Sequence, residues 1–147
     1  MDNTKEYILQ CEKAEEIQLL KPNPKEEDRN DVEYVSYFYL PEEERVEILK
    51  FDNDEDHPII GGYHDDESGA IWLPTQDQLQ DLLNYELSDL TYDFNEFNFD
   101  KKFGGLLSID KFTSMEQLWL AFVMYEKYVK YWDGKKWESD FSKINNI

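Results

Sequence analysis

The sequence predicts a single α+β domain in which a small antiparallel sheet packs against about three helices. The chain has 147 residues, 40% of them hydrophobic and 16% aromatic, so it has the size of one domain and enough apolar material for a core. Its middle is rich in β-branched and aromatic residues without crossover helices, which disfavours a parallel sheet. We expect the sheet over residues 32–73, helices near 4–20, 75–85 and 114–130, and a closing hairpin around Gly134.

The first expected helix, over residues 4–20, places Tyr7, Cys11 and Ile17 on one apolar stripe. Pro22 ends it, because proline lacks the amide donor that a helix needs. Cys11 is the only cysteine, so no disulfide can form within the chain. Its place on the stripe predicts a buried structural thiol, since a nucleophile must be accessible and activated.

The second expected helix follows Pro74 and spans residues 75–85. Thr75 and Gln78 have the spacing of a capping box at its start. The next stretch, 86–112, mixes phenylalanine with aspartate and asparagine. We interpret it as a long, partly packed excursion that contains a short helical turn.

The last expected helix, over residues 114–130, has the clearest pattern. Its wide apolar face is typical of a buried helix. Its capping box is formed either by Thr113 with Glu116 or by Ser114 with Gln117.

Three or four strands joined by acidic turns are expected before the second helix. Their segments are rich in valine, isoleucine, tyrosine and phenylalanine. In chain order the segments are 32–39, 46–51, 58–63 and 70–73. An Asp-Gly turn between two tryptophans predicts the separate hairpin around Gly134.

The charge of the chain is strongly negative and unevenly distributed. With 34 acidic and 15 basic residues, the net charge is -19. Residues 1–74 hold 21 acidic and 7 basic residues, whereas residues 75–147 hold 13 and 8. This balance argues against direct binding to nucleic acid or to an anionic membrane, which are polyanions. It favours a protein partner with a basic surface.

The acidic turns of the expected sheet are the candidate partner-binding face. Its ten residues are Glu42, Glu43, Glu44, Asp52, Asp54, Glu55, Asp56, Asp65, Asp66 and Glu67. The alternative is that this charge only confers solubility. A binding face requires a continuous acidic surface, whereas solubility does not.

No catalytic residue, cofactor or metal site is predicted. The chain contains no nucleophile elbow, phosphate-binding loop or zinc-protease motif. The acidic loop 52–56 begins like an EF-hand, but His57 stands where glycine is needed and Tyr63 where glutamate is needed. His57 and His64 lie seven residues apart, on opposite faces of an ideal strand, which disfavours a shared metal.

The sequence is typical of a cytoplasmic protein. Its first residues lack the basic and apolar regions of a signal peptide. No apolar run approaches the length of a membrane span. A single cysteine is consistent with a reducing compartment.

Four segments together resemble a family of small phage and prophage proteins from Gram-positive bacteria. They read YILQCEKAEEIQLLKP at 7–22, IWLPTQDQLQDLL at 71–83, SMEQLWLAFVMYEKY at 114–128 and WDGKKW at 132–137. The family supplies no catalytic residues to carry over. The resemblance therefore implies a phage-borne origin and no activity.

Three hypotheses for function follow. The first is a non-enzymatic acidic binding protein, such as a phage counter-defence or accessory factor, whose carboxylates mimic nucleic acid toward a basic host protein. The second is a structural or assembly protein that oligomerises or docks through the aromatic residues of 86–112. The third, a metal-dependent enzyme centred on His57 and His64, is disfavoured by their spacing. The oligomeric state is not predicted.

Overall fold

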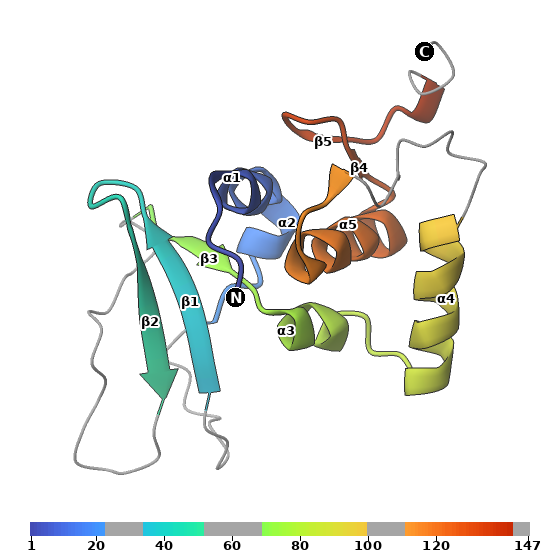
Figure 1. Ribbon diagram of the computed structural model, residues 1–147, viewed down its shortest axis with the longest axis horizontal. Coiled ribbons are helices and arrows are strands. Elements are labelled where there is room, and N and C mark those ends of the chain that lie inside the picture. The colour runs from blue at the N-terminus through green and yellow to red at the C-terminus, as the bar shows by residue number, and fades with distance from the viewer. Residues whose placement is uncertain (23–33, 52–68, 100–110, 143–147) are drawn as a thin grey trace.

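An antiparallel sheet forms one side of the molecule, and helices fill the space beside it (Figure 1). The structure is a computed structural model, which describes residues 1–22, 34–51, 69–99 and 111–142. The helices of this part of the chain are α1 (Lys5–Lys13), α2 (Glu15–Gln18), α3 (Gln76–Asp81), α4 (Leu87–Phe99) and α5 (Met115–Tyr128). The strands are β1 (Tyr34–Leu40), β2 (Arg45–Phe51), β3 (Ile71–Leu73), β4 (Tyr131–Trp132) and β5 (Trp137–Glu138). The α+β fold class is thus confirmed.

The larger sheet has the strand order β2-β1-β3 and is antiparallel throughout. In the central strand, Phe38 pairs with Glu47 of β2 on one side and with Trp72 of β3 on the other. Ser36, Phe38 and Leu40 are buried, and the residues between them are half-buried, as expected for a strand with one face on the core. The strand expected at 58–63 lies outside the described residues.

The first expected helix is wrong as a single element, because it breaks at Ala14. This residue has φ -86° and ψ 70°, which ends α1 and starts α2 in a new direction. The break lets Gln18 reach the edge of the sheet, where its amide accepts from the backbone N–H of Trp72 at 2.9 Å and donates to the Trp72 carbonyl at 3.0 Å. The same amide nitrogen donates to the carbonyl of Cys11 at 3.1 Å. The Gln18 side chain therefore pairs with the backbone N–H and carbonyl of Trp72 at the edge of β3, as a neighbouring strand would.

The helix α3 is joined to the sheet by its capping residue. The predicted capping box of Thr75 and Gln78 is present, and Gln78 Oε1 accepts from the Thr75 backbone N–H at 3.0 Å. The amide nitrogen of Gln78 donates to the carbonyl of Val35 and to Ser36 Oγ, both at 3.1 Å. One side chain thus caps the helix and fixes its position against β1.

The prediction of a partly packed excursion over 86–112 is wrong for Leu87–Phe99, which form α4. Leu90, Phe94 and Phe97 have helical spacing and face the interior. The polar residues between them hide this period in the sequence. The remainder of the stretch up to residue 110 lies outside the described residues.

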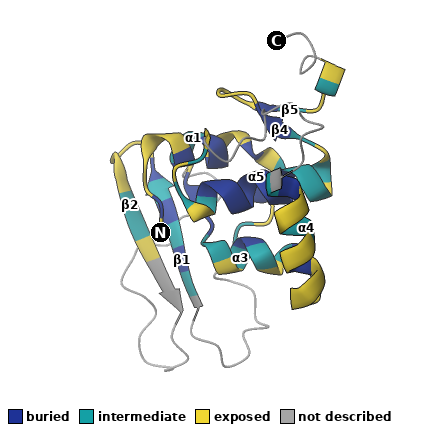
Figure 2. Cartoon of the chain, turned by 45° about the vertical axis from the view of Figure 1, so that its right-hand side comes forward, coloured by how far each residue is buried: buried dark blue, intermediate teal, exposed yellow. Residues whose placement is uncertain are grey.

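The core is centred on α5, which Figure 2 shows as a mostly buried helix. The ring of Phe94 stacks on Trp119 with centroids 4.0 Å apart, and Phe97 packs against Phe122 at 5.2 Å. These contacts attach α4 to α5.

The hairpin of β4 and β5 confirms the turn expected around Gly134, whose φ of 103° requires glycine. It packs on α1 through its tryptophans. The indole of Trp132 donates to Glu6 Oε1 and that of Trp137 to the carbonyl of Gln10, each at 2.9 Å. The hairpin therefore covers the first helix of the chain.

Candidate functional site

The acidic turn between β1 and β2 holds the part of the predicted binding face that the structure describes. Glu42, Glu43 and Glu44 are all exposed there, and Glu44 has a left-handed φ of 50° that closes the turn. The seven other predicted residues, Asp52, Asp54, Glu55, Asp56, Asp65, Asp66 and Glu67, lie outside the described residues. The turn joins the end of β1 to the start of β2 (Figure 1).

The charge of this turn is partly balanced. Arg45 Nε donates to Glu43 Oε2 at 2.5 Å, and its guanidinium also pairs with Glu47. The hydrogen bond with Glu43 is the main reason that the pKa of Arg45 is raised. Glu42 and Glu44 belong to none of the ion pairs formed among the described residues. Two of the three glutamates of the turn thus have no counter-charge within the described residues.

A second group of carboxylates lies on α4, where the sequence did not place a binding site. Asp89, Tyr92, Asp93 and Glu96 follow one another at spacings of three, one and three residues, so they share one side of the helix. We call these four residues the α4 stripe. Asp93 is half-buried and the other three are exposed. Helical periodicity could have revealed the stripe, had this segment been recognised as a helix.

The α4 stripe is close to a further carboxylate on α5. The pKa of Glu126 is raised, first by burial and then by the negative charge of Asp93. The pKa of Tyr85, in the segment before α4, is raised by burial and then by Glu126 and Asp93. The neighbouring Lys127 donates instead to the carbonyl of Leu82 at 2.8 Å. The group therefore concentrates negative charge.

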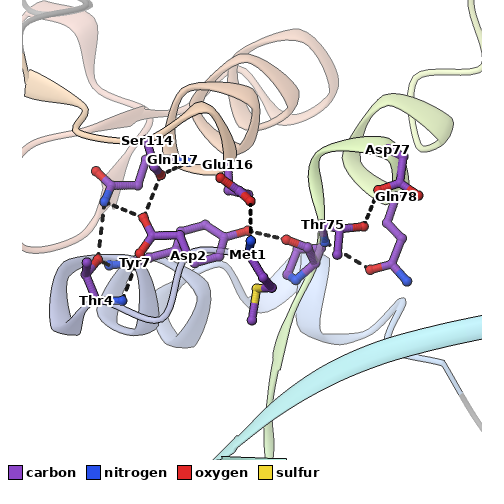
Figure 3. A network of polar contacts seen from close by, with 11 residues as sticks. Met1, Asp2, Thr4, Tyr7, Thr75, Asp77, Gln78, Ser114, Glu116 and Gln117 are labelled. Atoms are coloured by element: carbon purple, nitrogen blue, oxygen red, sulfur yellow. Dashed lines mark hydrogen bonds and ion pairs between the residues drawn. The ribbon is translucent and has the colours of Figure 1, made fainter. Parts of the chain in front are cut away.

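Carboxylates occur at a third place, where Asp2 of the N-terminal segment is buried against the start of α5 (Figure 3). Its Oδ2 accepts from Ser114 Oγ at 2.5 Å and from Gln117 Nε2 at 2.7 Å, and its Oδ1 accepts from the Thr4 backbone N–H at 2.8 Å. Beside it, the Met1 amino group lies 3.3 Å from a carboxylate oxygen of Glu116. This Asp2 cluster joins residues more than a hundred positions apart in the sequence.

Hydrogen bonding sets the charge state of Asp2. Burial alone would raise its pKa, but hydrogen bonds from Ser114, Thr4 and Gln117 outweigh burial, so the pKa of Asp2 is lowered. Ser114 is also the N-cap of α5 and accepts from the Gln117 backbone N–H at 3.1 Å. Of the two capping pairs expected for this helix, the structure thus uses Ser114 with Gln117. The Asp2 cluster has the features of a structural junction.

Cys11 is buried, as predicted, and burial raises the pKa of its thiol. The neighbouring Tyr7 donates its hydroxyl hydrogen to the carbonyl of Pro74 at 2.5 Å. Such a thiol lacks the access and the thiolate character of a nucleophile.

His57 and His64, the two histidines whose spacing disfavours a shared metal, both lie outside the described residues. Within the four described ranges, no group of three or more His, Cys, Asp or Glu side chains could hold a metal ion.

The aromatic residues of 86–112 divide into two groups. Phe94 and Phe97 pack against α5 within the chain, and Phe112 is partly buried against the core. Tyr92, by contrast, is 64% exposed. Of the described aromatic side chains in this segment, Tyr92 is therefore the one available to a partner.

Comparison with protein-family models, with curated proteins and with solved structures finds no match to this chain. The resemblance to phage and prophage proteins therefore stays a prediction. Among the residues that the structure describes, the helices are too short or too polar to cross a membrane.

Proposed function

We propose that this chain is a non-enzymatic acidic binding protein that engages a basic, nucleic-acid-handling protein by charge mimicry. The observation that carries the proposal is the row of three exposed glutamates at the tip of the β1–β2 hairpin, only one of which pairs with Arg45. The net charge of -19 supports it. In this proposal the protein is cytoplasmic and serves a phage as a counter-defence or accessory factor.

The physical basis of the proposal is the similarity of carboxylates and phosphates as partners for lysine and arginine. A channel that binds nucleic acid presents these cations in a row, and their attraction for anions speeds association. Carboxylates on a rigid hairpin can occupy such a channel without presenting a scissile backbone. Binding of this kind weakens as salt screens the charges.

A pull-down from bacterial lysate at about 0.15 M and about 0.5 M salt tests the proposal, because the higher salt shortens the Debye length. We expect one dominant basic nucleic-acid-handling protein, retained at low salt and lost at high salt. The turn variant, in which Glu42, Glu43 and Glu44 become glutamine, should retain less of it. A partner that resists salt, or no partner at all, would contradict charge mimicry.

A second candidate function is a structural or assembly protein that self-associates or docks through the aromatic residues of 86–112. The exposure of Tyr92 favours it. Size-exclusion chromatography with light scattering tests self-association, since the monomer has a mass of 17.7 kDa. A larger mass that depends on Tyr92 would favour this candidate over the first.

A further inference from the structure

The outer face of α4 combines exposed apolar side chains with carboxylates that no described cation balances. We propose that this face is a docking surface for a basic amphipathic helix of a protein partner. The inference rests on the proposed function only in that the partner is basic. It adds a second contact surface, separate from the β1–β2 turn.

The helix α4 is held by one side and leaves the other free. Its inner side is fixed by Leu90, Phe94 and Phe97, which pack toward α5. Its outer side is largely exposed (Figure 2). A rigid helix with one anchored side presents its outer side chains in a fixed arrangement, as a recognition surface requires.

Two exposed tyrosines lie on and beside this face. Tyr92, within the α4 stripe, is 64% exposed, and Tyr85, in the preceding segment and close to Asp93 and Glu126, is 44% exposed. Apolar groups surrounded by polar residues are typical of protein-binding sites, and tyrosine is enriched there. These residues point to an apolar component in the partner.

The carboxylates of the α4 stripe are arranged unfavourably for the isolated protein. Asp89 and Asp93 are four residues apart and Asp93 and Glu96 three apart, spacings at which like charges destabilise a helix. None of these three takes part in an ion pair among the described residues. Glu126 of α5 adds a fourth carboxylate, whose raised pKa reflects burial and the charge of Asp93. Cations from a partner would relieve this repulsion.

The negative charge of the stripe and its length along α4 together favour a basic helix as the partner. From Asp89 to Glu96 the stripe spans eight residues, or about 10 Å along the helix axis, which is about two turns of an opposing helix. A helix with lysine or arginine beside leucine or phenylalanine would match the carboxylates and the apolar groups at once. A second copy of this chain would instead bring two acidic stripes together, which disfavours a homodimer through this face.

Fluorescence anisotropy with a synthetic probe tests the inference. The probe is a labelled helical peptide of about 14 residues with leucine on one face and lysine on the flanks, used at about 0.15 M salt. A second peptide has the same composition in a scrambled order, so it keeps the charge and loses the apolar face. We expect the first peptide to bind at least about tenfold more tightly than the second.

The stripe variant, with Asp89→Asn, Asp93→Asn and Glu96→Gln, should weaken binding of the helical peptide at least about tenfold. The turn variant defined above is the matched control, because it removes the same number of charges. It should weaken binding less than about twofold. Far-UV circular dichroism should show both variants folded, since the changed side chains lie at the surface or half-buried and have no hydrogen bond in the core.

Equal losses in the two variants would overturn the inference and show that the peptide responds only to total charge. Loss in the turn variant alone would also overturn it and would leave the proposed function intact. Unchanged binding in both, or equal binding of both peptides, would contradict a specific surface on α4. A lysate partner that the stripe variant still captures would reject this surface without rejecting a basic partner.

Discussion

The Asp2 cluster and the α4 stripe show the two opposite situations of carboxylates in this molecule. Asp2 is only 7% exposed and accepts hydrogen bonds from three residues on two separate segments. The carboxylates of the α4 stripe have no cation within the described part of the chain and face one another at helical spacing. The first arrangement stabilises the fold, whereas the second costs the fold stability and leaves charge available for binding.

The pKa values of Asp2 and of Glu126, which lies beside the α4 stripe, move in opposite directions for this reason. Hydrogen-bond donors lower the pKa of Asp2, while burial and the charge of Asp93 raise the pKa of Glu126. A count of acidic residues in the sequence does not separate these cases. The two cases are separated by the hydrogen-bond donors around the carboxylate, and for Asp2 these donors include Ser114 and Gln117, which are distant in the sequence.

The largest expected effect on the free energy of unfolding comes from Phe97, which anchors the inner side of α4 to α5. Phe97→Ala removes a buried ring that packs on Phe122 and Tyr125, so it should lower the free energy of unfolding by about 3–5 kcal/mol. Urea denaturation measures the change. Tyr92→Ala, on the outer side of the same helix, is the control and should stay within about 0.5 kcal/mol. Similar losses in both variants would mean that α4 is not anchored as described.

The next effect concerns the Asp2 cluster. Asp2→Ala leaves the donors of Thr4, Ser114 and Gln117 without their acceptor, so we expect a loss of about 2–4 kcal/mol in the free energy of unfolding. Asp89→Ala removes an exposed carboxylate and should change it by less than about 0.5 kcal/mol. A neutral result at Asp2 would show that the junction does not depend on its carboxylate.

The pH dependence of the free energy of unfolding distinguishes the contribution of Asp2 from that of Glu126. Because the folded-state pKa of Asp2 lies below the ordinary value of 3.8, its stabilisation is present above that pH and is lost as the pH falls through the folded pKa. Asp2→Asn should flatten this acid limb. Glu126 has a raised pKa, so its charge destabilises the fold near neutral pH and protonation on acidification relieves the cost.

The Glu126→Gln variant should accordingly be slightly more stable than the unmodified chain at pH 7 and equal to it at pH 3. Unfolding in urea across this pH range gives both comparisons. Parallel pH profiles for all three proteins would show that neither carboxylate is perturbed.

The smallest effect is within the α4 stripe itself. Asp93→Asn removes repulsion with Asp89 and Glu96, so it should raise the free energy of unfolding by about 0.2–0.5 kcal/mol per pair relieved. Thermal unfolding at low salt should show the gain, which should shrink at about 0.5 M salt. Glu42→Gln, in the turn, should give no such gain. A destabilised Asp93→Asn protein would mean that this carboxylate has a stabilising partner.

Local sequence signals predicted α5, the capping pairs and the hairpin at Gly134, because their determinants lie within a few residues. The break at Ala14 could not be predicted in this way, since Gln18 finds its partner Trp72 54 positions away. The role of Asp2 is equally hidden, because its acceptor function depends on residues of α5. The segment of α4 was different. The spacing of Leu90, Phe94 and Phe97 was present in the sequence, but the Asp and Asn residues between them favoured a loop.

The acidic face predicted from the sequence includes the turn between β1 and β2. Its turn residues Glu42–Glu44 are exposed as expected, while its other members lie outside the described residues. The charge on α4 was missed because it follows from the helix, and the helix was not recognised.

The docking of the β4–β5 hairpin on α1 has a consequence for how the chain folds during synthesis. Trp132 and Trp137 bind residues of α1 that precede them by 126 and 127 positions. At about 5–20 residues per second, the ribosome needs roughly 6–25 seconds to make the intervening chain. During that time the side of α1 that carries Glu6 and Gln10 lacks its hairpin partner. One side of the first helix is thus closed only after nearly the whole chain has been made, and nascent chains stalled before residue 130 should leave that side open to chaperones.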